Sequence, residues 1–182
     1  MTIEIPGYRV GTWKIDPSHS EVGFSIRHLA ISKVKGTFGT FEGTFVTTEN
    51  PLDTRVTASA EVASVSTKDE GRDAHLRTGD FFDAEKYPTI TFVSTKAREE
   101  GDRLLADGEL TMRGVTKPVT FEIEFGGFGP DLNGNYKAGL TASTVIKRAD
   151  FGLSFNAPLE TGGVLLGDTV TITLELQAVL EQ

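Results

Sequence analysis

The segment from Ser66 to Pro88, STKDEGRDAHLRTGDFFDAEKYP, is the one long stretch of this sequence that cannot form a strand. Thr67 and Glu70 have the T-x-x-E spacing of a capping box, in which each side chain binds a free amide of the first helical turn. Gly79 stands where a helix often ends, because glycine readily adopts a positive φ. We therefore predict a helix of about three turns over residues 68–78.

This predicted helix has few apolar side chains with which to pack against a core. Arg72, His75 and Leu76 share one face at the i, i+3 and i+4 spacing, and Leu76 is the only large apolar residue among them. Phe81 and Phe82 follow just beyond the helix and are better suited to anchor it. We interpret the segment as a polar lid or plug at an opening, held in place by the Phe pair.

Extended, alternating sequence lies on both sides of this segment. Apolar side chains recur at every second position, which is the period of a half-buried strand, and turn signals such as Asn133-Gly134 separate the runs. Because the links are mostly short, we expect about eight antiparallel strands. They cover residues 13–26 (with a break at Asp16-Pro17-Ser18), 34–46 (with a bulge or turn near Gly39), 55–65, 88–98, 103–112, 115–125, 137–146 and 168–179.

Two architectures fit this pattern, a closed eight-stranded barrel and a β-sandwich. A closed sheet has no exposed edges, and eight strands enclose room for one small ligand. Glycines within the predicted strands suit sharp bends or a close approach to the backbone, and Phe supplies 12 aromatic residues against one Trp and three Tyr. Ordinary core residues would leave the same pattern, but we favour a barrel with an apolar cavity. The glycines are Gly23, Gly36, Gly43, Gly108 and Gly139.

Length and charge exclude several classes of partner. The 182 residues suit an N-terminal arm over 1–12 and a single domain over 13–182. A formal net charge of -8 argues against nucleic acid and anionic membrane surfaces. No apolar run approaches the ~18 residues of a membrane-spanning helix, so we expect no integral membrane segment. The first residues lack the basic and apolar regions of a secretion signal, so we expect a cytoplasmic location.

The residues that could support catalysis or metal binding form no recognisable signature. The chain has no cysteine, and the spacing of His19, His28 and His75 matches no ligand motif. Nucleophile elbows and phosphate-binding loops are absent from the sequence. We therefore predict no metal, no cofactor and no catalytic residue. The run over 147–152, KRADFG, fits either a ligand-facing loop or a turn locked by ion pairs.

Several motifs stand in a defined order along nearly the whole chain. They are Trp13-x-Ile15-Asp16-Pro17-x-His19-Ser20, Val22-x-Phe24-Ser25-x-Arg27-His28, Val34-x-Gly36-x-Phe38, Arg72-Asp73-x-His75-Leu76-Arg77, Asp80-Phe81-Phe82-Asp83, Tyr87-Pro88-x-Ile90-x-Phe92, Gly108-x-Leu110-Thr111-x-Arg113-Gly114-Val115-Thr116-Lys117-Pro118-Val119, Lys147-Arg148-x-Asp150-Phe151-Gly152 and Gly167-Asp168-x-Val170-x-Ile172. Together they resemble the YceI family of bacterial lipocalin-like proteins, which bind polyisoprenoids and other long apolar amphiphiles.

The resemblance implies an all-β fold, an extended eight-stranded antiparallel lipocalin-like barrel with a short helical segment at about 67–83. It implies an elongated apolar tunnel that binds a long-chain isoprenoid, such as a polyisoprenoid or an isoprenoid quinone, or an acyl lipid. It also implies binding without catalysis and a possible homodimer. Many relatives carry a secretion signal, whereas this sequence shows none. The alternative function is an enzyme that acts on a lipid or isoprenoid, with histidine as one possible catalyst.

The candidate ligand-binding residues follow from strand parity and from these motifs. Arg72, His75 and His28 would meet a polar head group or, on the alternative interpretation, brace Asp73, Asp16 or backbone carbonyls. The remaining candidates are expected to form the apolar lining. These are Phe24, Ile26, Phe38, Phe45, Phe82, Phe92, Phe121 and Ile123.

Overall fold

A computed structural model describes residues 4–29, 31–157 and 165–182. Within these ranges the chain forms eleven strands, one α-helix and four short 3-10 helices. The strands are β1 (Gly11–Ile15), β2 (Glu21–His28), β3 (Ser32–Phe38), β4 (Phe41–Thr47), β5 (Arg55–Glu61), β6 (Val65–Ser66), β7 (Thr89–Glu100), β8 (Arg103–Met112), β9 (Val115–Pro130), β10 (Tyr136–Lys147) and β11 (Leu166–Leu180). The helices are α1 (Glu70–Leu76), η1 (Pro17–His19), η2 (Pro51–Asp53), η3 (Val62–Ser64) and η4 (Arg148–Phe151).

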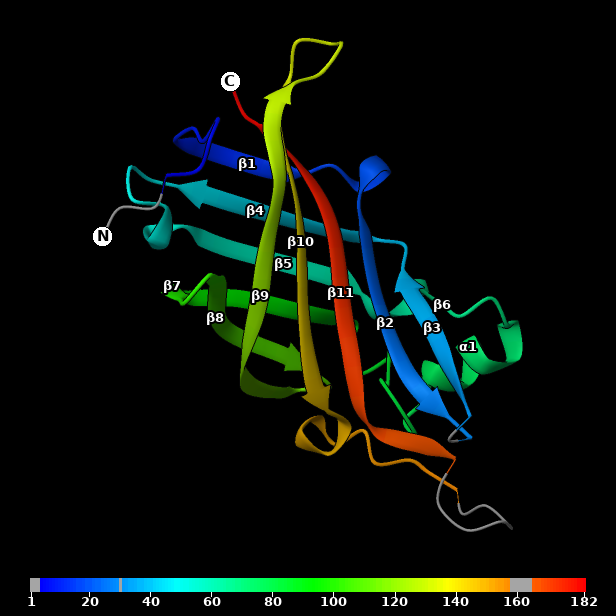
Figure 1. Ribbon diagram of the computed structural model, residues 1–182. Helices are drawn as coiled ribbons and strands as arrows, with labels where there is room; N and C mark the ends of the chain where they lie inside the picture. The colour runs from blue at the N-terminus through cyan, green and yellow to red at the C-terminus, as the bar shows by residue number, and fades with distance from the viewer. Residues whose placement is uncertain (1–3, 30, 158–164) are drawn as a thin grey trace.

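Eight of the strands close into an antiparallel barrel, which confirms the predicted fold class. The order is β1-β4-β5-β7-β8-β9-β10-β11, and β11 pairs back with β1. The earlier part of β11 pairs with β2, β2 pairs with β3, and β3 pairs with β6. Figure 1 shows β9, β10 and β11 crossing steeply over the layer formed by β1, β4, β5 and β7, with α1 beside β3 and β6.

The strand breaks expected from the sequence are present. The first predicted strand is divided into β1 and β2 by η1, where the Asp16 carboxylate accepts hydrogen bonds from the amide and hydroxyl of Ser18. The predicted strand over 34–46 is divided near Gly39 into β3, which pairs with β2 and β6, and β4, which pairs with β1 and β5, so Phe38 and Phe41 stand on different strands. The turn at Asn133-Gly134 joins β9 to β10, and Gly134 has a φ of 84°.

The helix is shorter than predicted, and its N-cap is a different residue. Asp69, not Thr67, caps α1 by accepting a hydrogen bond of 3.0 Å from the amide of Arg72. The capping-box prediction is wrong because Thr67 already has other partners. Its amide and hydroxyl donate to the Asp73 carboxylate, and its hydroxyl and carbonyl oxygens accept from the Arg72 side chain.

The prediction for the helix C-terminus is also wrong. The helix ends with Arg77 as its C-cap, and Gly79 is not among the residues with a positive φ. Backbone hydrogen bonds replace a glycine cap, since the amide of Phe82 donates to the carbonyl of Leu76 and that of Ala84 to the carbonyl of Arg77. The chain therefore folds back on the helix and directs the Phe pair inward.

The predicted anchors lie in the core. Phe81 is 9% exposed and packs in a cluster with Phe151 and Leu153, and Phe82 packs between this cluster and a second one that contains Phe38. The helix itself contributes a buried carboxylate, Asp73. The Phe pair, together with Leu76, thus packs an otherwise polar segment against the core.

Two of the strand glycines leave room for an aromatic ring. Gly36 on β3 stands opposite Phe24 on β2, and a Cβ atom at Gly36 would collide with the Phe24 ring. Gly108 on β8 stands opposite Ser94 on β7, and a Cβ atom at Gly108 would collide with the Phe92 ring and with the Val93 carbonyl oxygen. Because glycine has no side chain, each ring can lie directly over the backbone of the neighbouring strand.

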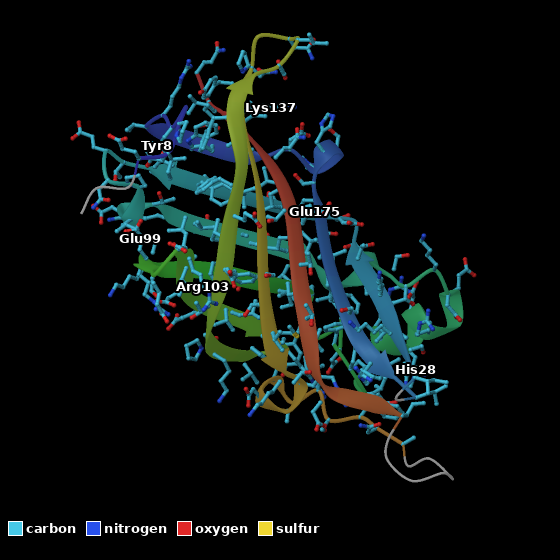
Figure 2. All side chains as sticks on the ribbon, in the orientation of Figure 1. Tyr8, His28, Glu99, Arg103, Lys137 and Glu175 are labelled. Atoms are coloured by element: carbon cyan, nitrogen blue, oxygen red, sulfur yellow. The ribbon has the colours of Figure 1, made fainter. Side chains whose placement is uncertain are left out.

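The barrel has two dissimilar ends, which we name the aromatic end and the helix end. At the aromatic end, Trp13 is 2% exposed and packs with Phe128 and Tyr136. The helix end carries α1 and the last residues of β2. Figure 2 shows Tyr8 and Lys137 at the aromatic end and His28 at the opposite, helix end.

Candidate functional site

The barrel encloses a cavity of about 400 Å³. This volume falls in the range of small-molecule sites, about 300–1,000 Å³. Its wall is mostly apolar and is built from the inward side chains of strands in both layers, from α1 and from the residues that follow β10. A molecule held there would meet chiefly hydrocarbon.

All eleven residues predicted to bind a ligand lie in this wall. Their contact with a ligand stays a prediction, because the structure contains none. The eleven are Phe24, Ile26, His28, Phe38, Phe45, Arg72, His75, Phe82, Phe92, Phe121 and Ile123.

Hydrogen bonds and ring contacts close the aromatic end of the barrel. The indole Nε1 of Trp13 donates to Thr47 Oγ1 at 3.0 Å, and Phe128 packs edge-on against Trp13 with ring centroids 5.8 Å apart. The Tyr8 hydroxyl, from the N-terminal arm, donates to the Thr48 carbonyl at 2.6 Å. Trp13, Phe128 and Tyr8 do not line the cavity, so the cavity ends below this aromatic layer.

The histidine of α1 lies among aromatic rings at the helix end. His75 Nε2 lies 2.8 Å from the carboxylate of Asp80, and its ring packs edge-on against Phe81 and Phe155 at 5.0 and 4.9 Å. The Asp80 partner holds the imidazole in one orientation. His75 thus combines a cavity-lining position with a bracing contact.

Arg72 likewise combines both predicted roles. Its Nε donates to the Thr67 hydroxyl at 2.7 Å and its Nη2 to the Thr67 carbonyl at 2.9 Å, while the side chain also lines the cavity. The alternative interpretation, that this residue braces its surroundings, therefore describes its observed hydrogen bonds. The predicted partner Asp73 is reached through Thr67 rather than directly.

Arg148 is a cavity-lining residue that was not among the candidate ligand-binding residues. It is 6% exposed and donates to the carbonyl oxygens of Gly167, Leu153 and Phe155 at 2.9, 2.6 and 3.1 Å. Burial lowers the pKa of its guanidinium, and the charge of Asp168 opposes that shift. The turn around η4 is thus held by backbone carbonyls instead of the ion pairs considered for it, and it also faces the cavity. The KRADFG motif was the sequence signal that could have identified Arg148, but residue spacing does not show whether its side chain points into the cavity.

The three histidines do not come together. His19 lies in η1 and pairs with Asp16 at 2.9 Å, whereas His28 and His75 line the cavity. Within residues 4–29, 31–157 and 165–182, no three His, Cys, Asp or Glu side chains are grouped as metal ligands. The same residues include no helix that is long and apolar enough to cross a membrane.

The protein is an antiparallel barrel with a closed aromatic end and an apolar interior, and it therefore belongs to the class of β-barrels with an internal cavity. The YceI-like domain family matches residues 13–178, and the chain belongs to this family. A UPF0312 protein of Photorhabdus laumondii subsp. laumondii is 42% identical over 158 residues, which cover 86% of this chain and 76% of that protein.

Solved structures share the fold. The YceI protein of Campylobacter jejuni is similar with a TM-score of 0.72 and 32% identity, and the match covers 92% of this chain and 96% of that one. A polyisoprenoid binding domain from Saccharophagus degradans, implicated in plant cell wall breakdown, matches with a TM-score of 0.70 over 93% of this chain and 98% of that one. At 17% identity the latter shows a common fold alone.

Proposed function

We propose that this protein binds one long-chain apolar amphiphile, a polyisoprenoid, an isoprenoid quinone or an acyl lipid, and stores or transports it without chemical change. The observation that carries the proposal is the apolar cavity of about 400 Å³ inside a barrel that is closed at the aromatic end. The likeness to the Saccharophagus degradans domain is consistent with a prenyl chain but adds only a shared fold.

The free energies of the two kinds of contact indicate that the apolar tail of the ligand, and not its head group, supplies most of the affinity. Each buried methylene contributes about 0.8 kcal/mol, so about ten methylenes would contribute about 8 kcal/mol before the entropic cost of binding. One hydrogen bond to a neutral head group contributes about 0.5–1.5 kcal/mol. A protein with this cavity is therefore expected to keep its ligand through purification.

The test is native mass spectrometry of detergent-free protein, followed by extraction and identification of any bound lipid. The protein should carry a stoichiometric apolar ligand, and delipidated protein should take up an added prenyl or acyl chain and release it with unchanged mass. A chemically altered chain would instead indicate an enzyme. Failure to retain or take up any apolar chain would contradict the proposal.

A matched pair of variants assigns the ligand to the cavity. Ala142 is 4% exposed and lines the cavity, whereas its neighbour Ser143 is exposed on the other face of β10. Ala142→Trp should fill the cavity and reduce lipid uptake, and Ser143→Trp should leave uptake unchanged. Circular dichroism of both variants checks that the barrel is intact. Equal uptake by the two variants would place the ligand elsewhere.

A further inference from the structure

The guanidinium of Arg148 is buried and only partly satisfied. Its Nε and Nη1 donate to the three carbonyl oxygens of Gly167, Leu153 and Phe155. Its Nη2 has no hydrogen-bond partner among the described residues, and the side chain lines the cavity. The unused side of this planar donor is thus available to a molecule inside the barrel.

The positive charge of Arg148 also lacks a direct counter-ion. Asp168 acts on it through space, but no carboxylate within the described residues forms an ion pair with it. Carbonyl oxygens carry only partial charge, and a buried cation without an anion is costly. A negative group placed in the cavity beside Arg148 would offset this cost.

Other basic and imidazole side chains line the same cavity. The Phe155 carbonyl accepts from Arg148 while the Phe155 ring packs on His75, so these two side chains flank one residue. Arg72 lies one helical turn before His75 and lines the cavity; the residue is exposed, and its Nη1 has no partner in the described part of the chain. His28 stands opposite Leu166 on β11, next to the Gly167 carbonyl that Arg148 binds.

We propose that Arg148, assisted by Arg72, binds an anionic head group, a phosphate or a carboxylate, on the amphiphile whose chain fills the cavity. The proposal rests on the proposed function and adds the charge of the ligand and its orientation. The planar guanidinium suits the paired oxygens of either group. The head group lies at the helix end, and the chain runs towards the Trp13 layer.

The first experiment measures affinities of delipidated wild-type protein for two matched pairs of ligands. One pair is geranylgeranyl phosphate and geranylgeraniol, and the other is palmitate and hexadecanol. The anion should bind about tenfold or more tightly than its alcohol in at least one pair, since a hydrogen bond to a charged group is worth about 1.5–3 kcal/mol. Preference in the prenyl pair identifies a phosphate, and preference in the acyl pair identifies a carboxylate.

The second experiment assigns that preference to the guanidinium. Arg148→Met should reduce the preference to about threefold or less while the affinity for the alcohol is kept. Arg113→Met is the matched control, because Arg113 also donates to two carbonyls, those of Gly152 and Gly79 at 2.7 and 2.8 Å, but does not line the cavity. If Arg148→Met does not fold, Arg72→Met, which should weaken the preference, takes its place.

The outcomes separate this inference from the proposed function. Equal binding of anion and alcohol in both pairs overturns the head-group inference and leaves lipid binding intact. Preference that persists undiminished in folded Arg148→Met, or in Arg72→Met when that variant is the one that folds, also overturns it. If none of the four ligands binds, the proposed function itself is wrong.

Discussion

The two ends of the barrel differ in whether their polar side chains find hydrogen-bond partners within the protein. At the aromatic end, polar atoms are satisfied within the chain: the Trp13 indole binds Thr47, and the hydroxyls of Tyr8 and Tyr136 each bind a backbone carbonyl at 2.6 Å. At the helix end, the buried Arg148 and the exposed Arg72 each keep a donor without a partner among the described residues. An end with satisfied groups closes the barrel, whereas an end with spare donors can bind a ligand. We therefore expect a ligand to enter chain-first at the helix end.

The largest expected effect is on stability at the aromatic end. Trp13→Ala should lower the free energy of unfolding by about 3–5 kcal/mol, because it removes a large buried side chain. Trp13→Phe should cost less, since it keeps the ring contacts and loses the bond to Thr47. Chemical denaturation measures both. The folded fraction of either variant should still retain lipid, and complete loss of lipid from stable Trp13→Phe would contradict the division between the two ends.

The next effect concerns lipid retention at the helix end. Phe82→Asp should reduce retention by about tenfold or more, because it places a carboxylate in the lining and removes about 1.5–3 kcal/mol of apolar burial. His75→Ala should have a smaller effect, since it removes the hydrogen bond to Asp80 and the ring contacts with Phe81 and Phe155 but places no charge in the lining. Lipid content per protein after delipidation and reloading decides between them.

Phe82→Leu is the control for that comparison, because it keeps an apolar side chain in contact with Phe38. It should stay closer to wild type than Phe82→Asp. If His75→Ala empties the protein while Phe82→Asp remains folded and full, head-group capture dominates and the apolar lining at Phe82 is not the source of retention.

The smallest effect is a pH dependence at the aromatic end. Hydrogen bonds from Ser18 and then His19, with a further one from Lys137, hold the pKa of Asp16 well below its usual value. A lowered pKa stabilises the fold above the unfolded-state value of about 3.9, and this stabilisation is lost as the pH falls towards the folded-state pKa. Asp16→Asn should therefore lower Tm by about 2–4 °C at neutral pH and by less below about pH 4.

Thermal denaturation at several pH values checks this prediction, with Asp102→Asn as the control. Asp102 lies exposed in the turn between β7 and β8 and has no hydrogen-bond or ion-pair partner within the described residues. Its substitution should leave Tm nearly unchanged across the range. A constant difference between Asp16→Asn and wild type at every pH would show that the carboxylate charge does not stabilise the aromatic end.

The barrel and its lining could be predicted from the sequence because period-two alternation fixes which side chains share a face. Phe92 on β7 and Phe121 on β9 flank β8 and pack edge-on at 5.2 Å, which agrees with the shared face that strand parity predicts. Alternation alone does not distinguish a closed barrel from a β-sandwich. The resemblance to the YceI family implied the closed barrel. The expectations of a cytoplasmic location and a homodimer stay predictions.

The errors lie where several polar side chains compete for one partner. Thr67 has capping-box spacing, but the Asp73 carboxylate takes its amide and hydroxyl hydrogens, and Asp69 caps the helix instead. The run over 147–152 fits either a ligand-facing loop or a turn locked by ion pairs, and the position of Arg148 depends on residues 153–155 and 167, which approach it only in the folded chain. Such choices depend on three-dimensional proximity and not on local pattern.

The Phe rings that lie over glycines affect the size of the ligand that the cavity can hold. Phe24 and Phe92 line the cavity, whereas Gly36 and Gly108 behind them do not. A methyl group at Gly36 would displace the Phe24 ring and change the space for a ligand, whereas one at Gly108 would meet both the Phe92 ring and the Val93 carbonyl oxygen. The choice of ligand in this barrel can therefore be changed from positions that no ligand touches. Relatives with identical linings could still differ in the bulk of the chain that they accept.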